Sequence, residues 1–369
     1  MKKVLFVATV TRHINAFHIP YLKWFKEQGY EVHVASSGDE EIPYCDKHFN
    51  LNFARFPIKL QNLKVYKELK NIIEENKYEI IHCHTPVGGA ITRLAARNAR
   101  KKYNTKVIYT AHGFHFYKGA PILNWLIYYP IEKYLARYTD CLITINQEDY
   151  ERAKRKIKKA KLIKYVHGVG FNAERLNTIP EENYKERMNC NKDDIIFCYV
   201  AEINKNKNQE MVVKCIKKIK NDYPNIKVLL AGKDSSNGKL EELVVKEGLK
   251  DNIILLGNRD DIGKILSITD IYLATSLREG LPVNIMEAMY KKLPIIAMNN
   301  RGHRALIENE KSGIIIENEE MMKEKIIELI CDKKRRERLG INAYQNVQQY
   351  KIDNVIKEMI EIYEGVNQI

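Results

Sequence analysis

Residues 271–298 read IYLATSLREGLPVNIMEAMYKKLPIIAM. Two short apolar runs, IYLATS and LPIIAM, flank a polar turn and a helical pattern that begins near Pro282. Neighbouring strands that are joined by a helix usually run parallel, because antiparallel neighbours can use a short hairpin instead. The stretch therefore predicts a β–α–β unit. It places one acid, Glu279, before the helix and a second acid, Glu287, inside it.

The same alternation of apolar runs and helical patterns continues along the chain in both directions. Most of the runs are continuous in Ile, Leu and Val, which is typical of strands that are buried on both faces. Further strands are predicted at residues 4–10, 31–36, 79–84, 106–112, 141–146, 195–202, 227–232, 253–257 and 313–316. The pattern predicts an α/β fold with doubly wound parallel sheets covered by helices.

A length of 369 residues indicates two domains. The alternation breaks at residues 167–194, a polar segment with Gly and Pro that we interpret as an interdomain connection. We therefore expect an N-terminal domain over residues 1–170 and a C-terminal domain over residues 171–349. The final helical stretch, about 350–369, is expected to rejoin the first domain. Ligands of such folds bind at the carboxyl ends of the strands.

The net charge of +14 lies entirely in the first half of the chain. Residues 1–172 hold 29 Lys and Arg against 15 Asp and Glu, whereas residues 173–369 hold 32 of each kind. This imbalance indicates an anionic surface or partner for the first domain. One such surface is a membrane: the segment 151–164 carries eight cations and one acid, and the segment 117–138 mixes aromatic and aliphatic residues with flanking cations. The alternative for the first segment is a solvated helix face, and the alternative for the second is a core-packed helix.

The cysteines and the apolar segments indicate in which cellular compartment the protein is expected. Seven cysteines without a C-x-x-C pair indicate a reduced, cytoplasmic protein. The first apolar run ends at Thr11 and lacks a convincing cleavage site, so we interpret it as a buried strand and not as a signal peptide. The longest uncharged stretch, residues 120–131, is too short to span a bilayer. We expect a cytoplasmic protein that is peripheral at the inner face of the plasma membrane.

Two acids around the turn at residues 279–287 suit a ligand that carries both phosphate and hydroxyl groups. Pro282 suits the first helical turn, and the amides of Gly280, Leu281 and Val283 would then form an anion site at a helix N-terminus. Glu279 could accept hydrogen bonds from hydroxyls. Ordinary helix electrostatics is the alternative, since an acid near a helix N-terminus is stabilising without any ligand.

The segment EGLPVNIME, from Glu279 to Glu287, resembles the E-x7-E signature of family 4 of the retaining glycosyltransferases. The resemblance covers essentially the whole chain, including the order of strands and helices. It implies the GT-B fold, in which two Rossmann-like domains face each other. It also implies a catalytic role for Glu279 at the donor sugar, a ribose-binding role for Glu287, and donor binding by the amides of Gly280 and Leu281.

Further donor-site residues follow from this resemblance. Lys207 stands where the family has a diphosphate-binding Lys, and we expect it to be catalytic because a cation there offsets charge on the leaving group. The family's Arg position holds Glu202, which leaves the diphosphate one cation short unless Lys205 or a residue elsewhere compensates. Arg259 is expected to stack on the base, the alternative being a surface turn with Asp260 as a helix cap. Gly232 could give backbone access to the donor or be a turn glycine.

Several histidines follow predicted strands of the first domain. His112 resembles the family's His that reaches the donor sugar, and we expect it to be catalytic. His13, His18 and His84 are expected to bind the acceptor, although the Gly-Gly pair that many members have after the first strand is missing. A metal site at the pair His82 and His84 lacks carboxylate or thiolate partners at suitable spacing, so no metal and no cofactor are predicted.

The leading hypothesis is a metal-independent retaining transferase. It would move a hexose or N-acetylhexosamine from a nucleoside-diphosphate sugar, with uridine as the commonest base by resemblance, to a lipid-linked saccharide for capsule, exopolysaccharide or other surface polysaccharide. The alternatives are a sugar-nucleotide epimerase or hydrolase of the same fold, a nucleic-acid-binding protein and a non-catalytic scaffold. No nucleic-acid module is recognised. A dehydrogenase is disfavoured because no G-x-G-x-x-G follows the first strand.

Overall fold

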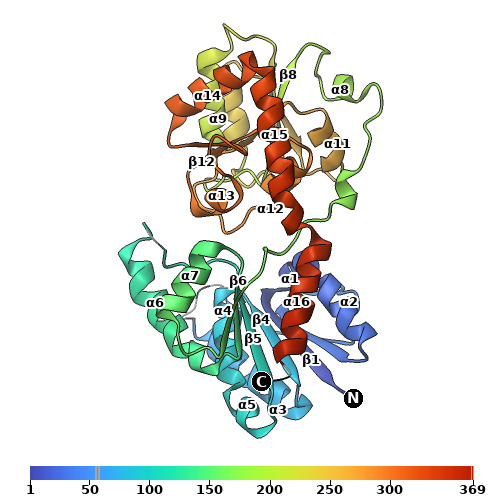
Figure 1. Cartoon of the computed structure of the whole chain (residues 1–369), viewed down its shortest axis with the longest axis vertical. Helices are drawn as coiled ribbons and strands as arrows, with labels where there is room; N and C mark the ends of the chain where they lie inside the picture. Colours follow the sequence, from blue (N-terminus) through green and yellow to red (C-terminus); the bar gives the residue numbers. More distant parts are fainter. Residues whose placement is uncertain (55, 57–58, 118, 367, 369) are drawn as a thin grey trace. The chain divides into compact units, whose positions relative to one another are not determined.

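The computed structural model describes residues 1–54, 56, 59–117, 119–366 and 368. The chain forms two compact units (Figure 1). Unit 1 comprises Met1–Gly170 and Asp353–Ile369, and unit 2 comprises Phe171–Ile352. The chain thus leaves unit 1 once and returns to it through the C-terminal helix.

Unit 1 is built on a seven-stranded parallel sheet of order β3-β2-β1-β4-β5-β6-β7. Its strands are β1 (Lys3–Val10), β2 (Glu31–Ser37), β3 (Lys47–Asn50), β4 (Ile80–His84), β5 (Lys106–Ala111), β6 (Cys141–Thr144) and β7 (Leu162–Tyr165). Its helices are α1 (Thr11–Phe17), α2 (Ile19–Glu27), α3 (Gln61–Asn76), α4 (Pro86–Ala95), α5 (Arg97–Lys102), α6 (Ile122–Leu135), α7 (Gln147–Lys156), α16 (Ile352–Val366) and the 3-10 turn η1 (Ala136–Tyr138).

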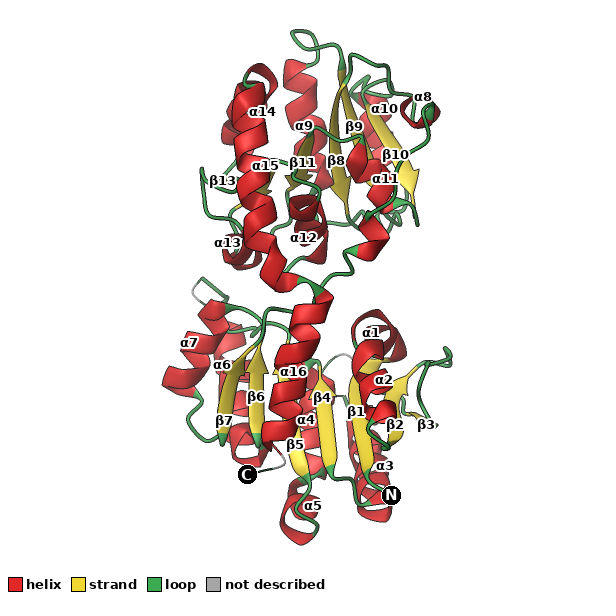
Figure 2. Cartoon of the chain, turned by 45° about the vertical axis from the view of Figure 1, so that its right-hand side comes forward, coloured by secondary structure: helices red, strands yellow, loops and turns green. Residues whose placement is uncertain are grey.

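The strand β1 shows why this sheet must be covered on both faces. Its side chains alternate between two apolar clusters: Val4 and Phe6 pack with α2 and α16, whereas Leu5 and Val7 pack with α3 and α4. Figure 2 shows these two pairs of helices on opposite sides of the strands. Because successive strand residues point to opposite faces, a run without polar residues buries both faces at once.

The helix α16 belongs to unit 1 through its apolar face. Its residues Val355, Met359 and Tyr363 join the cluster that contains α2. The Tyr363 hydroxyl lies 2.8 Å from Nδ1 of His82 on β4. Apolar positions four residues apart fall on one helix face, so this helix buries a stripe against the sheet.

Unit 2 contains a six-stranded parallel sheet of order β10-β9-β8-β11-β12-β13. Its strands are β8 (Ile195–Val200), β9 (Ile226–Ala231), β10 (Ile253–Gly257), β11 (Ile271–Ala274), β12 (Ile295–Met298) and β13 (Ile314–Ile316). Its helices are α8 (Tyr184–Arg187), α9 (Gln209–Ile219), α10 (Lys239–Lys246), α11 (Ile262–Ser267), α12 (Val283–Tyr290), α13 (Arg301–Leu306), α14 (Glu319–Cys331), α15 (Lys333–Val347) and the 3-10 turns η2 (Glu174–Leu176) and η3 (Gln348–Tyr350). The doubly wound parallel α/β class predicted from the sequence is confirmed in both units.

Two strands and one helix start differ from the sequence prediction. The strands β3 and β7 were not predicted; both are four-residue strands at the edges of the unit 1 sheet, and neither has a fully buried residue. The strand β7 begins inside the basic segment 151–164, so the alternative that this segment is one solvated helix face is wrong beyond Lys156. Pro282 is the N-cap of α12 and precedes its first turn.

Within the described residues, no helix is long and apolar enough to cross a bilayer. The seven cysteines are all free, and Cys83, Cys141, Cys190, Cys198 and Cys215 are buried as small apolar groups.

A buried ion pair joins α4 to α6 in unit 1. The Arg93 guanidinium donates to both oxygens of Glu132, at 2.8 and 3.1 Å, and the two side chains are 1% and 8% exposed. The Tyr109 hydroxyl donates to the same carboxylate at 3.2 Å. Removing one partner of such a pair leaves the other charge buried without compensation.

Glu132→Ala is therefore expected to lower the free energy of unfolding of unit 1 by about 3–5 kcal/mol. Glu68→Ala, which removes a half-exposed acid on α3, should change it by less than about 0.5 kcal/mol. Urea unfolding followed by circular dichroism measures both values. Equal, small effects would show that the Arg93 charge does not need its partner.

Candidate active site

The loop between β11 and α12 carries the first predicted acid. The helix α12 is anchored to the neighbouring strand, because Nδ2 of Asn284 donates to the Val200 carbonyl at 2.7 Å. No hydrogen bond to a protein acceptor is present for the amides of Gly280, Leu281 and Val283, as far as the described residues show. Three amides without acceptors at a helix N-terminus are an arrangement that suits an anion.

The loop after β8 is held beside this loop by hydrogen bonds. The Thr275 hydroxyl lies 2.9 Å from the carbonyl oxygens of both Lys207 and Asn208. The Leu277 amide donates to the Asn206 carbonyl at 2.8 Å. The two loops meet because β8 and β11 are neighbours in the sheet and all strands end at the same edge.

This arrangement brings two predicted catalytic residues together. Nζ of Lys207 lies 2.5 Å from Oε1 of Glu279, and the side chains are 22% and 14% exposed. The helix α13 approaches so closely that a Cβ on Gly302 would lie 2.6 Å from Cβ of Glu279. The ammonium and the carboxylate are therefore fixed next to each other, beside the α12 amides.

Two polar residues beside this pair were not predicted from the sequence. Asn300 caps α13 by accepting from the His303 amide, and its Nδ2 donates to the Ser276 carbonyl at 2.7 Å. Burial lowers the pKa of His303 to about 4, and its Nδ1 lies 2.6 Å from the Met298 carbonyl. Their position just after β12 was the signal, because side chains there lie at the carboxyl edge of the sheet.

The second acid, Glu287, is the fifth residue of α12 and is partly buried. Burial raises the pKa of its carboxyl to about 7, and the charge of Arg175 offsets part of that rise. Arg175 lies in η2, within the connecting segment, and no sequence signal indicated its role. Glu279 and Glu287 thus sit in different surroundings, one paired with a lysine and one desolvated.

Glu202, which follows the end of β8, accepts hydrogen bonds through both its side chain and its backbone carbonyl. Its carboxylate accepts from the Ser235 hydroxyl, and its carbonyl accepts from the Gln209 side chain at 3.0 Å. A cavity of about 560 Å³ adjoins it, and two exposed lysines, Lys205 and Lys239, line this cavity. Lys239 was not predicted, because a lysine in the first turn of a helix gives no signal of its own. The cavity thus has two cationic side chains in its lining, on the side of the sheet edge where Glu202 follows β8.

The two remaining residues that were predicted for the donor site, Arg259 and Gly232, both have contacts within unit 2. Arg259 pairs with Asp261 through two hydrogen bonds of 2.8 and 2.6 Å, and the Tyr184 hydroxyl donates to the same carboxylate. The alternative of an Asp260 cap is wrong, because Asp261 is the N-cap of α11 and no side chain caps that helix. Gly232 is needed for packing, since a Cβ there would lie 2.0 Å from the Ala201 carbonyl oxygen.

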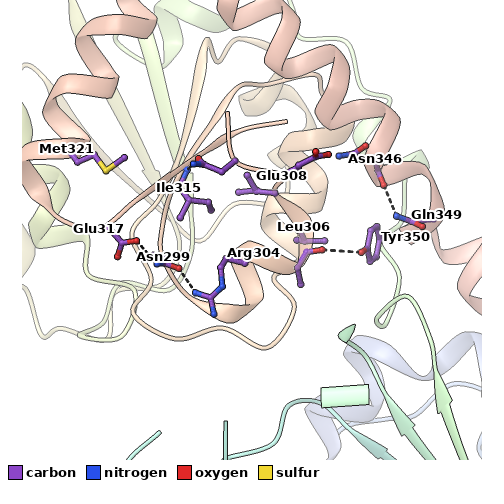
Figure 3. Close-up of a pocket in the computed structure, with 13 residues that line it drawn as sticks. Asn299, Arg304, Leu306, Glu308, Ile315, Glu317, Met321, Asn346, Gln349 and Tyr350 are labelled. Carbon is purple, nitrogen blue, oxygen red and sulfur yellow. Dashed lines mark hydrogen bonds between the residues drawn. The ribbon is translucent and has the colours of Figure 1, made fainter. Parts of the chain in front are cut away.

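A larger cavity of about 780 Å³ in unit 2 contains none of the predicted site residues. Figure 3 shows that three of its polar side chains bond to one another, with Asn299 between Glu317 and Arg304. These groups are already paired, so this cavity is not the candidate site.

In unit 1 the four predicted histidines gather at the carboxyl ends of β1, β4 and β5. Nε2 of His112 lies 3.2 Å from Nε2 of His13 and 3.4 Å from Nδ1 of His84, and the His18 ring stacks on the His84 ring at 3.8 Å. Burial lowers the pKa of all four imidazoles, that of His13 to about 4. His82 lies on the same face, and Tyr363 and Thr110 partner its two nitrogens.

Both halves of the chain match family models of glycosyltransferases. Residues 180–346 match the family model of glycosyl transferases group 1, and residues 3–146 match that of glycosyl transferase 4-like proteins. The "Putative glycosyltransferase EpsD" of Bacillus subtilis is 41% identical over 99% of this chain and 97% of its own length. The UDP-Gal:alpha-D-GlcNAc-diphosphoundecaprenol alpha-1,3-galactosyltransferase of Escherichia coli is 29% identical over 71% of this chain and 70% of its own.

A solved structure shows the same fold. Anabaena Alr3699/HepE, in complex with UDP and glucose, superposes with a TM-score of 0.80 over 99% of this chain and all of its own, at 16% identity. Together with the two parallel sheets, this similarity identifies the fold as GT-B.

The raised pKa of Glu287 predicts a pH-dependent contribution to stability. The native state binds this proton more tightly than the unfolded state, so stability falls as pH rises from the ordinary pKa of 4.5 to about 7. Relative to Glu287→Gln, the wild type is expected to lose at most about 3 kcal/mol between pH 5 and pH 8. Urea unfolding at both pH values measures the difference.

The matched control for this experiment is Glu324→Gln, which changes an exposed acid on α14 and should follow the wild type at both pH values. A constant difference between wild type and Glu287→Gln would contradict the desolvation of this carboxyl.

Proposed function

Because the chain belongs to the group 1 family of glycosyltransferases, we propose that it moves a hexose or N-acetylhexosamine from a nucleoside-diphosphate sugar, with uridine as the base, to a lipid-linked saccharide. The anomeric configuration would be retained. The observation that carries this proposal is the pair of Lys207 and Glu279 beside three amides without acceptors, with Glu287 farther along the same helix.

Each part of the donor has a chemical counterpart in this group of residues. The amides of Gly280 and Leu281 suit the oxygens of the diphosphate. The Glu279 carboxylate can accept hydrogen bonds from sugar hydroxyls, and Glu287 can hold the ribose hydroxyls. Arg259 and Gly232 are assigned to the donor by family resemblance, although Arg259 must then act while paired with Asp261.

The reaction would proceed on one face of the sugar. The bond between the anomeric carbon and the diphosphate oxygen breaks, and a bond to the acceptor oxygen forms on the same face. The acceptor's proton passes to the departing diphosphate oxygen, so no separate base is required. Lys207 offsets the charge that develops on the leaving group, and Lys205 with Lys239 supplies the cations that Glu202 does not. No metal ion or cofactor takes part in this scheme.

The acceptor side is assigned to unit 1. By resemblance, His112 contacts the donor sugar, and His13, His18 and His84 contact the acceptor. The name of the Escherichia coli relative specifies a diphosphoundecaprenol-linked acceptor. The name of the Bacillus subtilis relative specifies only a glycosyltransferase. The role of this chain in surface polysaccharide assembly is therefore proposed from the family resemblance.

Peripheral binding to the inner face of the plasma membrane is supported by α6. This helix packs Trp125 and Tyr129 against the core, while Ile122, Leu123 and Leu126 are 77%, 64% and 68% exposed. Three exposed apolar side chains in one segment, on the unit that carries the excess of cations, suit an anionic membrane surface. The alternative of a fully core-packed helix does not account for them.

Transfer is expected to depend on the ion pair. Glu279→Ala and Lys207→Ala should each lower the rate of sugar transfer by a factor of about 100 or more, because each removes charge from the reacting centre. Transfer is measured with radiolabelled donor and membranes that contain the lipid-linked acceptor. Matched controls are Glu320→Ala and Lys218→Ala, which remove an exposed ion pair of unit 2.

Wild-type rates in either ion-pair variant would overturn the assignment of that residue. Release of free sugar at the same rate without membranes would favour a hydrolase of the same fold.

The base preference is tested by thermal denaturation with UDP-, GDP- and ADP-sugars. A ligand at 100 times its Kd stabilises the native state by about 2.7 kcal/mol, which corresponds to a rise in Tm of roughly 5–10 °C for a unit of this size. We expect this rise with UDP-sugars. A larger rise with another nucleotide would replace uridine in the proposal.

A further inference from the structure

The histidine cluster of unit 1, defined as His13, His18, His84 and His112, draws its members from separate elements. His13 lies in α1, His18 joins α1 to α2, His84 ends β4, and His112 follows β5. The strands β1, β4 and β5 are neighbours, so the segments that follow them meet at one edge of the sheet. The cluster is therefore a product of the fold and lies wholly within one unit.

The spacing of the ring nitrogens suits coordination of one ion. The four histidines each offer one nitrogen, and these atoms all lie within 4.8 Å of one another. Two of the separations between ring nitrogens are 3.2 Å, from Nε2 of His13 to Nε2 of His112, and 3.4 Å, from Nε2 of His112 to Nδ1 of His84. A tetrahedral zinc site with Zn–N distances of about 2.0–2.1 Å has edges of about 3.3–3.4 Å.

Hydrogen bonding within the protein leaves this cluster unsatisfied. Among the described residues, neither ring nitrogen of His18 has a hydrogen-bond partner, nor has Nε2 of His84, and the two histidines are 2% and 0% exposed. Nε2 of His112 faces two other ring nitrogens at once, but it carries either one proton or one lone pair. By contrast, both nitrogens of the buried His82 and His33 are partnered. Buried polar atoms without partners are rare and need an explanation.

The type of ligand atom also favours a metal ion over an anion. Burial lowers the pKa of all four imidazoles, and the neutral imidazole is the form that donates a lone pair to a metal. Imidazole nitrogen suits zinc, copper, nickel and iron, whereas magnesium and calcium prefer oxygen ligands. His13 and His112 are partly exposed, which gives an ion access to the buried pair.

We propose that His13, His18, His84 and His112 bind one divalent transition-metal ion, with Zn²⁺ as the best geometric match. This site was not predicted from the sequence, because the spacing of the pair in HCH alone shows no third or fourth ligand. The ion would bind to the ring nitrogen through which His112 is proposed to contact the donor sugar. The metal-bound form is therefore not the transferring form, and transfer itself does not require the metal.

The experiment uses the full chain after chelator treatment and desalting. Titration with Co²⁺ is followed by visible absorption, and Zn²⁺ is then added as a competitor. We expect saturation at one Co²⁺ per chain, visible bands of a four-coordinate site, and their loss on adding Zn²⁺. His18→Leu and His84→Leu should each weaken binding at least tenfold. His33→Gln, which changes a buried unit 1 histidine whose nitrogens are already partnered, should bind Co²⁺ like the wild type.

Absence of saturable binding, or unchanged binding in both cluster variants, would overturn the proposal. If the variants do not fold, X-ray absorption of the zinc-loaded wild type decides instead. A shell of nitrogen atoms with imidazole scattering supports the site, and a shell with sulfur or mainly oxygen contradicts it. These measurements do not depend on sugar transfer, so failure of the metal site and failure of the proposed function are distinguishable.

Discussion

All strands in each sheet run parallel, and this constraint places every functional candidate. In a parallel sheet the loops that follow the strands open on one edge, so residues distant in sequence meet there without direct sequence signals. In unit 2 the loops after β8 and β11 meet, and Lys207 reaches Glu279 across 72 residues of chain. In unit 1 the segments after β1, β4 and β5 meet and gather four histidines. The two sites are thus separate consequences of one topological rule.

Electrostatics then gives the two sites different chemistry. At the α12 N-terminus, amides without acceptors and a lysine attract an anion, while the Glu279 carboxylate keeps the ammonium in place until a ligand competes for it. Glu287, one helical turn along, is desolvated and holds its proton up to about pH 7. In the histidine cluster, burial disfavours the charged imidazoles, and both ring nitrogens of His18 and Nε2 of His84 have no hydrogen-bond partner among the described residues. One site therefore suits a diphosphate and the other suits a cation.

The sequence predicted what periodicity and local chemistry encode. Strands that are continuous in Ile, Leu and Val were found because two buried faces leave no polar positions, whereas β3 and β7 were missed because edge strands keep exposed side chains. The EGLPVNIME segment indicated the donor loop because its acids and helix start are adjacent in the chain. Contacts between distant segments could not be predicted from the residues: Arg175 beside Glu287, Tyr184 beside Asp261, Lys239 in the cavity near Glu202, and the convergence of the four histidines.

The central claim is that the N-terminus of α12 binds a nucleoside diphosphate whose ribose is held by Glu287. Calorimetric titration of UDP, GDP and ADP into the wild type and into Glu287→Ala tests it most directly. The account predicts that one of these nucleotides binds the wild type at one molecule per chain and binds the variant at least tenfold more weakly. Equal affinity in both proteins, or no binding of any of the three, would contradict it.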